Sequence, residues 1–251
     1  MTGRALRTPW VRAAVDGYLR HYHRHNVHID ETVPDTTVLF VANHGFGGLV
    51  DLNVAAAFSA LDRAAVTRPV TALVHQLAWT MGLGTFVEAF GGVQASVAAV
   101  ENAFAAERNV LVFPGGDIDA GKSWRDRNTV CFDGRTGYAR MATECGVPIV
   151  PIVTSGAGES LFVLHDGRGL AAALRLPKLL RLNTLPVSIS IPWGLSVGVA
   201  GMLPYVAFPT KLETAILPAM TAELDETTES FAARVEAAMQ ARLDRLVSEN
   251  S

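Results

Sequence analysis

Short apolar runs alternate with longer segments of helical periodicity along most of the chain. Four of these runs are rich in β-branched residues and end in glycine, proline or polar residues, which is typical of buried strands. They cover residues 38–42, 70–74, 109–113 and 148–153. Strands that alternate with helices predict a single α/β domain with a mostly parallel sheet and helices on both of its faces.

Five segments before, between and after these strands have the apolar spacing of helices, and several begin with a capping residue. They cover residues 9–25, 51–61, 96–107, 135–145 and 227–247. The first of them lies in an N-terminal helical segment, residues 1–34. We distinguish this segment from the α/β domain proper, which we place at residues 35–251.

The last third of the chain contains an uncharged stretch, residues 184–210. It is long enough to span a bilayer, but its four prolines and three glycines argue against one continuous helix. We therefore predict strands and apolar loops that line a pocket or touch a lipid surface. The preceding segment, residues 169–182, is rich in leucine and basic residues. It is typical of either an interfacial membrane helix or a core helix with a solvated basic side.

Composition narrows the class of protein. The chain has 251 residues, of which 49% are hydrophobic and 18% charged, so disorder is excluded. A net charge of −3 gives no reason to expect a nucleic-acid partner. Two cysteines make neither a disulfide framework nor a metal cluster, and the first residues lack the apolar core of a secretory signal. We expect a cytoplasmic protein with no metal.

Four histidines fall in a polar region at the end of the first predicted helix and just after it. Histidine-rich tracts can bind metal ions, but no cysteine or glutamate cluster completes a tetrahedral site here. We therefore predict that these side chains are solvated. They are His21, His23, His25 and His28.

The first predicted strand carries the candidate chemistry. It ends in a glycine-rich turn with Asn43 and His44, and Asp51 stands where the next helix should begin. Open α/β sheets place their ligands at this edge, and a histidine oriented by a carboxylate is a general base. The simpler interpretation is a turn histidine beside an ordinary helix cap.

A competing motif follows the third strand. Residues 116–123 fit the phosphate-loop pattern G-x-x-x-x-G-K-S, which would indicate a nucleotide-binding enzyme. However, Asp117 and Asp119 would place two negative charges in the phosphate cradle, and no helical period follows Lys122 to supply a helix N-terminus. A magnesium ligand would have to be Asp166. We keep this interpretation as an alternative.

Several motifs occur in a recognisable order. Asn43-His44 precedes Asp51; Phe113-Pro114-Gly115-Gly116 follows the third strand; and a Val-Pro-Ile-Val-Pro strand covers residues 147–151. Over residues 35–155 the chain resembles the phospholipid and glycerol acyltransferase family. It is most similar to a bacterial branch of diacylglycerol-acyltransferase-like proteins, in which a Gly-Lys pair and a Gly-Arg-x-Gly-Tyr motif follow. Those motifs are found here at residues 121–122 and 134–138.

The resemblance implies transfer of a fatty acyl group from a thioester to a hydroxyl of a glycerolipid, lysophospholipid or other lipid-like alcohol. The thioester would be acyl-CoA or an acyl carrier protein, with no further cofactor. His44 would be the general base and Asp51 would orient it. Peripheral contact with the inner face of the cell membrane is expected. The substrate-binding residues implied are Asn43, Gly47, Gly48, Pro114, Gly115, Gly116, Lys122 and Arg135.

The sequence departs from the family pattern in two ways. Six residues separate His44 from Asp51 where the family usually has four. The arginines of members with phosphate-bearing acceptors are also missing, so either Lys122, Arg127 or Arg135 holds a phosphate or the acceptor is a neutral alcohol.

Two further expectations concern the acyl chain and an alternative function. Residues 184–210 and 79–90 are candidates for the walls of an acyl slot, although most of them are more typical of core. A third interpretation is a non-catalytic lipid-binding protein that keeps the same fold.

Overall fold

The computed structural model describes residues 9–45, 51–74, 92–179, 182–198 and 205–250. Over these residues, a seven-stranded sheet has the order β1-β10-β6-β2-β5-β3-β4. The strands from β6 to β4 in this order are parallel to one another, whereas β10 is antiparallel to β6 and β1 is parallel to β10. The mostly parallel sheet predicted from the sequence is therefore confirmed. The strands are β1 (Asn26–Ile29), β2 (Leu39–Ala42), β3 (Val70–Val74), β4 (Gly92–Gln94), β5 (Asn109–Val112), β6 (Ile149–Ser155) and β10 (Glu213–Ile216).

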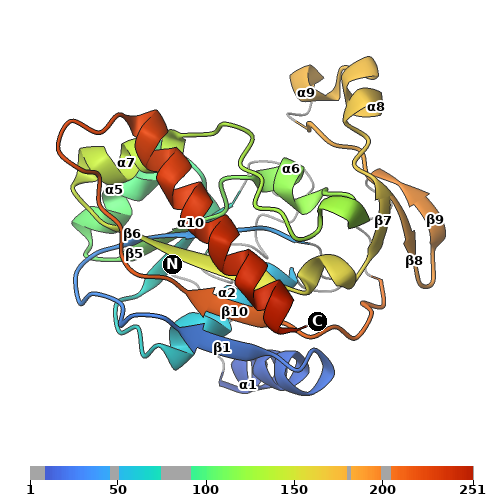
Figure 1. Ribbon diagram of the computed structural model, residues 1–251, viewed down its shortest axis with the longest axis horizontal. Helices are drawn as coiled ribbons and strands as arrows, with labels where there is room; N and C mark the ends of the chain where they lie inside the picture. Colours follow the sequence, from blue (N-terminus) through green and yellow to red (C-terminus); the bar gives the residue numbers. More distant parts are fainter. Residues whose placement is uncertain (1–8, 46–50, 75–91, 180–181, 199–204, 251) are drawn as a thin grey trace.

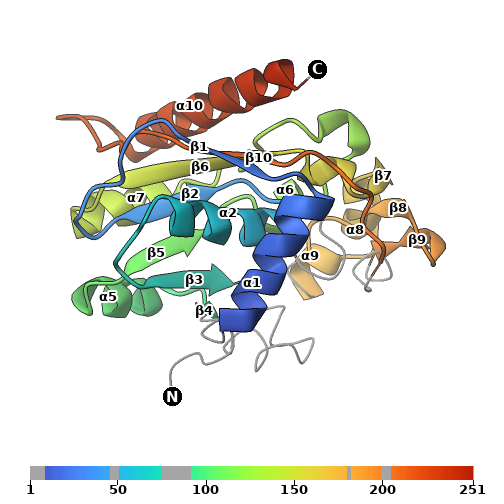
Figure 2. The same ribbon diagram turned by 90° about the horizontal axis from the view of Figure 1, so that it is seen from below.

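Helices cover both faces of this sheet. Helix α2 (Leu52–Arg63) packs on one face, and α5 (Val97–Ala105), α7 (Gly137–Cys145) and α10 (Thr228–Glu249) pack on the other. Helix α10 crosses the sheet diagonally in Figure 1, and Figure 2 shows it on the opposite side of the sheet from α2. The central strands are therefore buried on both sides, which is why they read as continuous apolar runs in the sequence.

The helix boundaries follow from local chemistry. The side chains of Asp51, Ser96 and Thr227 accept hydrogen bonds from backbone N–H groups at the starts of α2, α5 and α10. Gly146 ends α7 in the left-handed conformation, with φ of 64°.

The N-terminal segment differs from the prediction. Helix α1 (Pro9–Gly17) continues as a π-helix (Tyr18–Tyr22), and residues 26–29 then form β1 at the edge of the large sheet. The prediction that the histidines are solvated is wrong for His23 and His25, whose exposed fractions are 0% and 2%. They bond to the hydroxyls of Thr210 and Thr214, and burial lowers the pKa of each imidazole to about 4.

A second sheet lies at one end of the molecule (Figure 1). It has three antiparallel strands in the order β7-β8-β9, formed by Phe162–His165, Val187–Ser190 and Gly194–Val197. Strands and loops therefore replace a helix in the described part of residues 184–210, as predicted. No helix in the described part of the chain is both long and apolar enough to cross a membrane.

The basic leucine-rich segment forms two short helices rather than one. Helix α8 (Arg168–Ala173) ends before Arg175, whose φ is 56°, and α9 (Leu176–Leu179) then begins with Pro177 as its second residue. A positive φ stops a helix, and proline is tolerated in a first helical turn. The described residues of this segment therefore do not form one continuous helix, of either the interfacial or the core kind.

Candidate active site

The chain leaves strand β2 at Asn43, whose side chain fixes the neighbouring strand end. Its Nδ2 donates to the carbonyl of Thr154 in β6 at 3.0 Å, and its Oδ1 accepts from the Thr154 N–H at 2.8 Å. Its own carbonyl accepts from Asn53 of α2. Because both ends of the amide bind protein, Asn43 sets the point from which His44 projects.

His44 faces Asp51, from which six residues separate it in the sequence. The imidazole Nδ1 lies 2.9 Å from Asp51 Oδ2, while Oδ1 of the same carboxylate caps α2 by accepting from the Val54 N–H at 3.1 Å. The longer spacing between the two residues therefore does not prevent their contact. The Gly45 N–H is also 3.0 Å from Nδ1, but Asp51 only accepts, so a proton on Nδ1 satisfies the carboxylate and leaves the lone pair on Nε2.

The electrostatics around His44 favour its protonated form. Burial alone would lower the pKa of the imidazole, but the charge and hydrogen bond of Asp51, with a further contribution from the Asp119 charge, raise it above the ordinary 6.5. The side chain is 22% exposed, so it remains accessible from one side. Such a group can both take up a proton and be held in the charged form that results.

Asp119 is a site residue that the sequence interpretation missed. Its carboxylate is fully buried and accepts from the backbone N–H of His44 at 2.5 Å and from that of Cys131 at 3.1 Å. It also pairs with Lys122 at 2.6 Å. In the sequence analysis, Asp119 served only as a negative charge that argues against a phosphate loop. An acid and a base three residues apart just after a strand end would have been the signal for a buried pair.

The Pro114-Gly115-Gly116 turn lies next to this carboxylate. A Cβ on Gly115 would come within 2.2 Å of the Asp119 Cβ and 2.5 Å of the Cys131 carbonyl, so only glycine fits. Arg135 supports the turn, because its guanidinium donates to the carbonyls of Pro114 and Gly115 at 2.9 and 3.0 Å.

The phosphate-loop interpretation does not agree with the structure. Residues 116–120 form the short helix α6 (Gly116–Ala120), and Lys122 follows its C-terminus rather than starting a helix. The Lys122 ammonium is buried against Asp119 and the Thr129 carbonyl. Asp117 accepts from the N–H of Asn183 instead of facing a ligand. A phosphate at this place would meet neither a helix dipole nor a free lysine.

A narrow pocket opens beside His44, and the His44 ring lies 5.1 Å from the ring of Phe113. Residues from both sheets line this pocket. They include Asn43, His44, Gly45, Asn53, Asp119, Lys122, Arg127, Thr154 and Val163.

Some predicted residues cannot be placed at this site. Gly47, Gly48 and residues 79–90 lie outside the residues that the structure describes. Within those that it does describe, no group of three or more histidine, cysteine, aspartate or glutamate side chains is arranged to hold a metal ion.

Comparisons with known proteins agree with this fold. The fold matches the crystal structure of PlsC, the 1-acyl-sn-glycerophosphate (LPA) acyltransferase from Thermotoga maritima, with a TM-score of 0.51 and 15% identity over 95% of this chain and 81% of that one. A protein of Gallus gallus, described as a DGAT1/2-independent enzyme synthesizing storage lipids, is 25% identical over 230 residues. Those residues make up 92% of this chain but only 62% of the Gallus gallus protein. The model of the family described as Acyltransferase matches residues 24–155, more than half of the chain, and the protein therefore belongs to the Acyltransferase family.

Proposed function

We propose that this acyltransferase moves an acyl group from a thioester, acyl-CoA or acyl carrier protein, to the hydroxyl of a lipid-like alcohol. The observation that carries the proposal is the His44–Asp51 pair at 2.9 Å. His44 lines a pocket together with Asp119, the residue against which Gly115 of the Pro114–Gly116 turn packs. A non-catalytic lipid-binding protein would have no need for a histidine oriented in this way.

The chemistry needs no nucleophile from the protein. His44 Nε2 takes the hydroxyl proton while the alcohol oxygen attacks the thioester carbonyl carbon. Asp51 holds the other ring nitrogen and stabilises the imidazolium, as the acid of a serine-protease triad does. The tetrahedral oxyanion then collapses and the carbon–sulfur bond breaks. The departing thiolate takes the proton from His44, and ester and thiol are released.

We further propose that the acceptor is a neutral alcohol rather than a phosphomonoester. Each cation considered for a phosphate already has a protein partner: Lys122 binds Asp119, Arg135 binds the Pro114 and Gly115 carbonyls, and Arg127 donates to the Trp124 carbonyl at 2.7 Å. The Gallus gallus relative supports this choice, because storage-lipid synthesis is part of its description.

The test is release of free thiol from a long-chain acyl-CoA in the presence of different acceptors. A monoacylglycerol or diacylglycerol should support release better than a lysophosphatidic acid of the same chain length. His44→Ala and His44→Gln should reduce the rate by about 10²–10⁴-fold, the usual contribution of a general base. His21→Ala, which changes an exposed histidine far from the site in sequence, is the matched control and should have the wild-type rate.

Two results would contradict the proposal. Full activity in both His44 variants would show that His44 is not the general base. A strong preference for the phosphate-bearing acceptor would show that the acceptor is not a neutral alcohol. If acyl-CoA gives no release with any acceptor, an acyl carrier protein is the donor to test next. Failure of both donors would favour the lipid-binding protein.

A further inference from the structure

The outward-facing side chains of the small sheet are large and apolar, which is unusual for a sheet face that is surrounded only by water. Antiparallel sheets usually turn apolar side chains toward the core and polar ones outward. Here Ser188 and Ser196 are 1% and 6% exposed and face each other with their hydroxyl oxygens 3.3 Å apart. The residues on the other face are large, apolar and 37% to 67% exposed. They are Phe162, Leu164, Ile189, Ile191, Leu195 and Val197.

These side chains form one continuous surface, which we call the outer face of the small sheet. The strand register places Phe162, Ile189 and Leu195 side by side across β7, β8 and β9. Trp193, in the turn between β8 and β9, is 50% exposed. A contiguous apolar patch of this kind marks an interaction surface.

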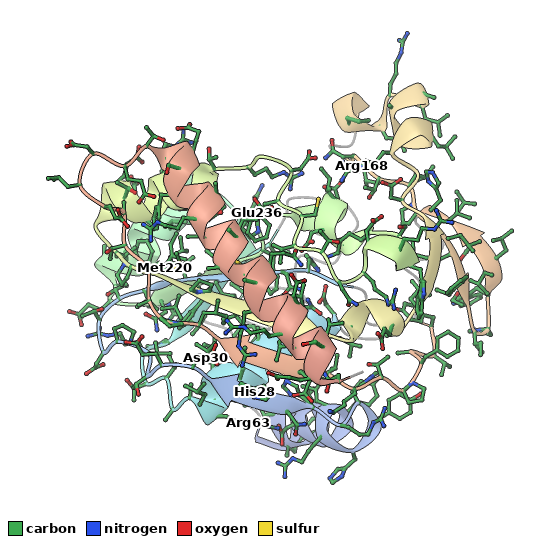
Figure 3. All side chains as sticks on the ribbon, in the orientation of Figure 1. His28, Asp30, Arg63, Arg168, Met220 and Glu236 are labelled. Atoms are coloured by element: carbon green, nitrogen blue, oxygen red, sulfur yellow. The ribbon has the colours of Figure 1, made fainter. Side chains whose placement is uncertain are left out.

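The charge of the surrounding chain indicates the partner. Between Asp166 and Glu213 there is no acidic residue, whereas there are five basic ones. Two of these, Arg168 and Arg175, are exposed on the α8–α9 segment, which lies with the small sheet at the same end of the molecule (Figure 1). Arg168, labelled in Figure 3, also pairs with Asp133 and Asp166 at 3.1 and 3.2 Å, so we assign the contact with headgroups to Arg175. Basic residues next to an apolar surface are attracted to anionic lipid headgroups.

The outer face is also close to the candidate active site. Strand β7 places Phe162 on this face, whereas its next residue, Val163, is buried and lines the pocket beside His44. The Phe162 ring lies 5.0 Å from that of Trp124, and Arg127 of the same pocket stacks over Trp124 at 4.6 Å. A surface bound to the outer face would thus be separated from the pocket by the thickness of one strand.

We propose that the outer face of the small sheet, together with the basic α8–α9 segment, docks this protein on an anionic lipid surface. The purpose of such docking rests on the proposed function, because lipid-like substrates partition into a membrane. The binding itself does not depend on catalysis and can be measured without it.

The test is sedimentation with vesicles of phosphatidylcholine, with and without phosphatidylglycerol. The double variant Ile189→Ser, Leu195→Ser should bind about tenfold more weakly or worse to the vesicles that contain phosphatidylglycerol. Arg175→Ala should weaken binding to those vesicles and leave binding to pure phosphatidylcholine unchanged. Leu224→Ser is the matched control, because Leu224 is 94% exposed but belongs to a different part of the chain, and it should bind like the wild type.

Circular dichroism and thiol release with a short-chain acyl-CoA and a water-soluble alcohol show whether the variants are folded. The docking proposal is overturned if the wild type does not sediment with either kind of vesicle, or if the double variant binds as tightly as the wild type does. A wild-type dimer that the double variant dissociates, without vesicle binding, would instead make the outer face a contact between two copies of the chain. If the wild type binds vesicles but releases no thiol with any acceptor, that result contradicts the proposed function and leaves the docking proposal intact.

Discussion

Asp51 has two structural roles that follow from one position. One carboxylate oxygen caps α2, and the other binds the imidazole of His44. The cap fixes where the helix begins, and hence where the carboxylate lies, whatever the length of the preceding loop. This is why a spacing of six residues still allows the contact.

The pH dependence of the reaction should reflect this contact. Because Asp51 raises the pKa of His44 above 6.5, and because a general base must be neutral, kcat/KM should rise with pH along a limb centred above 6.5. Asp51→Asn removes the charge, so the limb should move to lower pH. The rate should also fall, by up to about 10⁴-fold as in a serine-protease triad. A pH profile of thiol release for both proteins measures this, and an unchanged limb in the variant would exclude the role given to Asp51.

We expect Asp119 to contribute to the stability of the fold and to the position of the His44 backbone. Asp119→Asn leaves the buried Lys122 ammonium without its counter-charge and should cost about 3–5 kcal/mol of unfolding free energy, measured with denaturant. The double variant Asp119→Asn, Lys122→Met removes both charges and should recover much of that stability.

If Asp119 positions the His44 backbone, kcat should stay low in this double variant while KM changes little. A double variant that regains both stability and full kcat would show that the carboxylate serves only to neutralise Lys122.

At the scale of elements, the turn after β5 requires a glycine at position 115. Gly115→Ala would bring a Cβ against Asp119 and the Cys131 carbonyl, and should cost about 1–3 kcal/mol as overpacking does, with loss of activity. Gly137→Ala is the matched change, because a Cβ there meets nothing within 4 Å at the start of α7. It should leave stability unchanged or raise it by about 0.5–1 kcal/mol. Thermal melts of the two variants compare them, and equal melting temperatures would refute the steric argument.

At the scale of the whole molecule, one ion pair joins the two ends of the chain. Arg242 of α10 donates twice to the carboxylate of Asp30, just after β1, at 2.8 and 2.9 Å, and Figure 3 shows Asp30 beside α10. Arg242→Ala should therefore cost about 1.5–3 kcal/mol, since these are hydrogen bonds between charged groups and the Arg242 side chain is only 10% exposed. Arg245→Ala, an exposed arginine on the same helix, is the control and should be nearly neutral. If denaturant titration gives equal losses for both variants, the pair does not hold the chain ends together.

Much of the fold could be predicted because its signals are local. Strands buried on both faces require continuous apolar runs, and the capping residues Ser96 and Thr227 mark helix starts whatever surrounds them. His44 and Asp51 were found for the same reason, since a strand end and a helix start bring them to one edge of the sheet. The burial of His23 and His25 was missed, because the residues that cover them lie almost two hundred positions away.

The sequence by itself determined four neighbouring strands of the large sheet, β6, β2, β5 and β3, and the helices α1, α2, α5, α7 and α10. It also determined the pair of residues proposed for the chemistry, because hydrophobic periodicity and capping act over a few residues. Tertiary structure alone decided which groups the charged side chains contact within the protein: Lys122 pairs with Asp119, and Arg135 donates to the Pro114 carbonyl. It also decided the orientation of the small sheet. Alternation of serine with isoleucine or leucine predicts a strand with two different faces, but only packing against the rest of the chain determines that the serines are the ones inside.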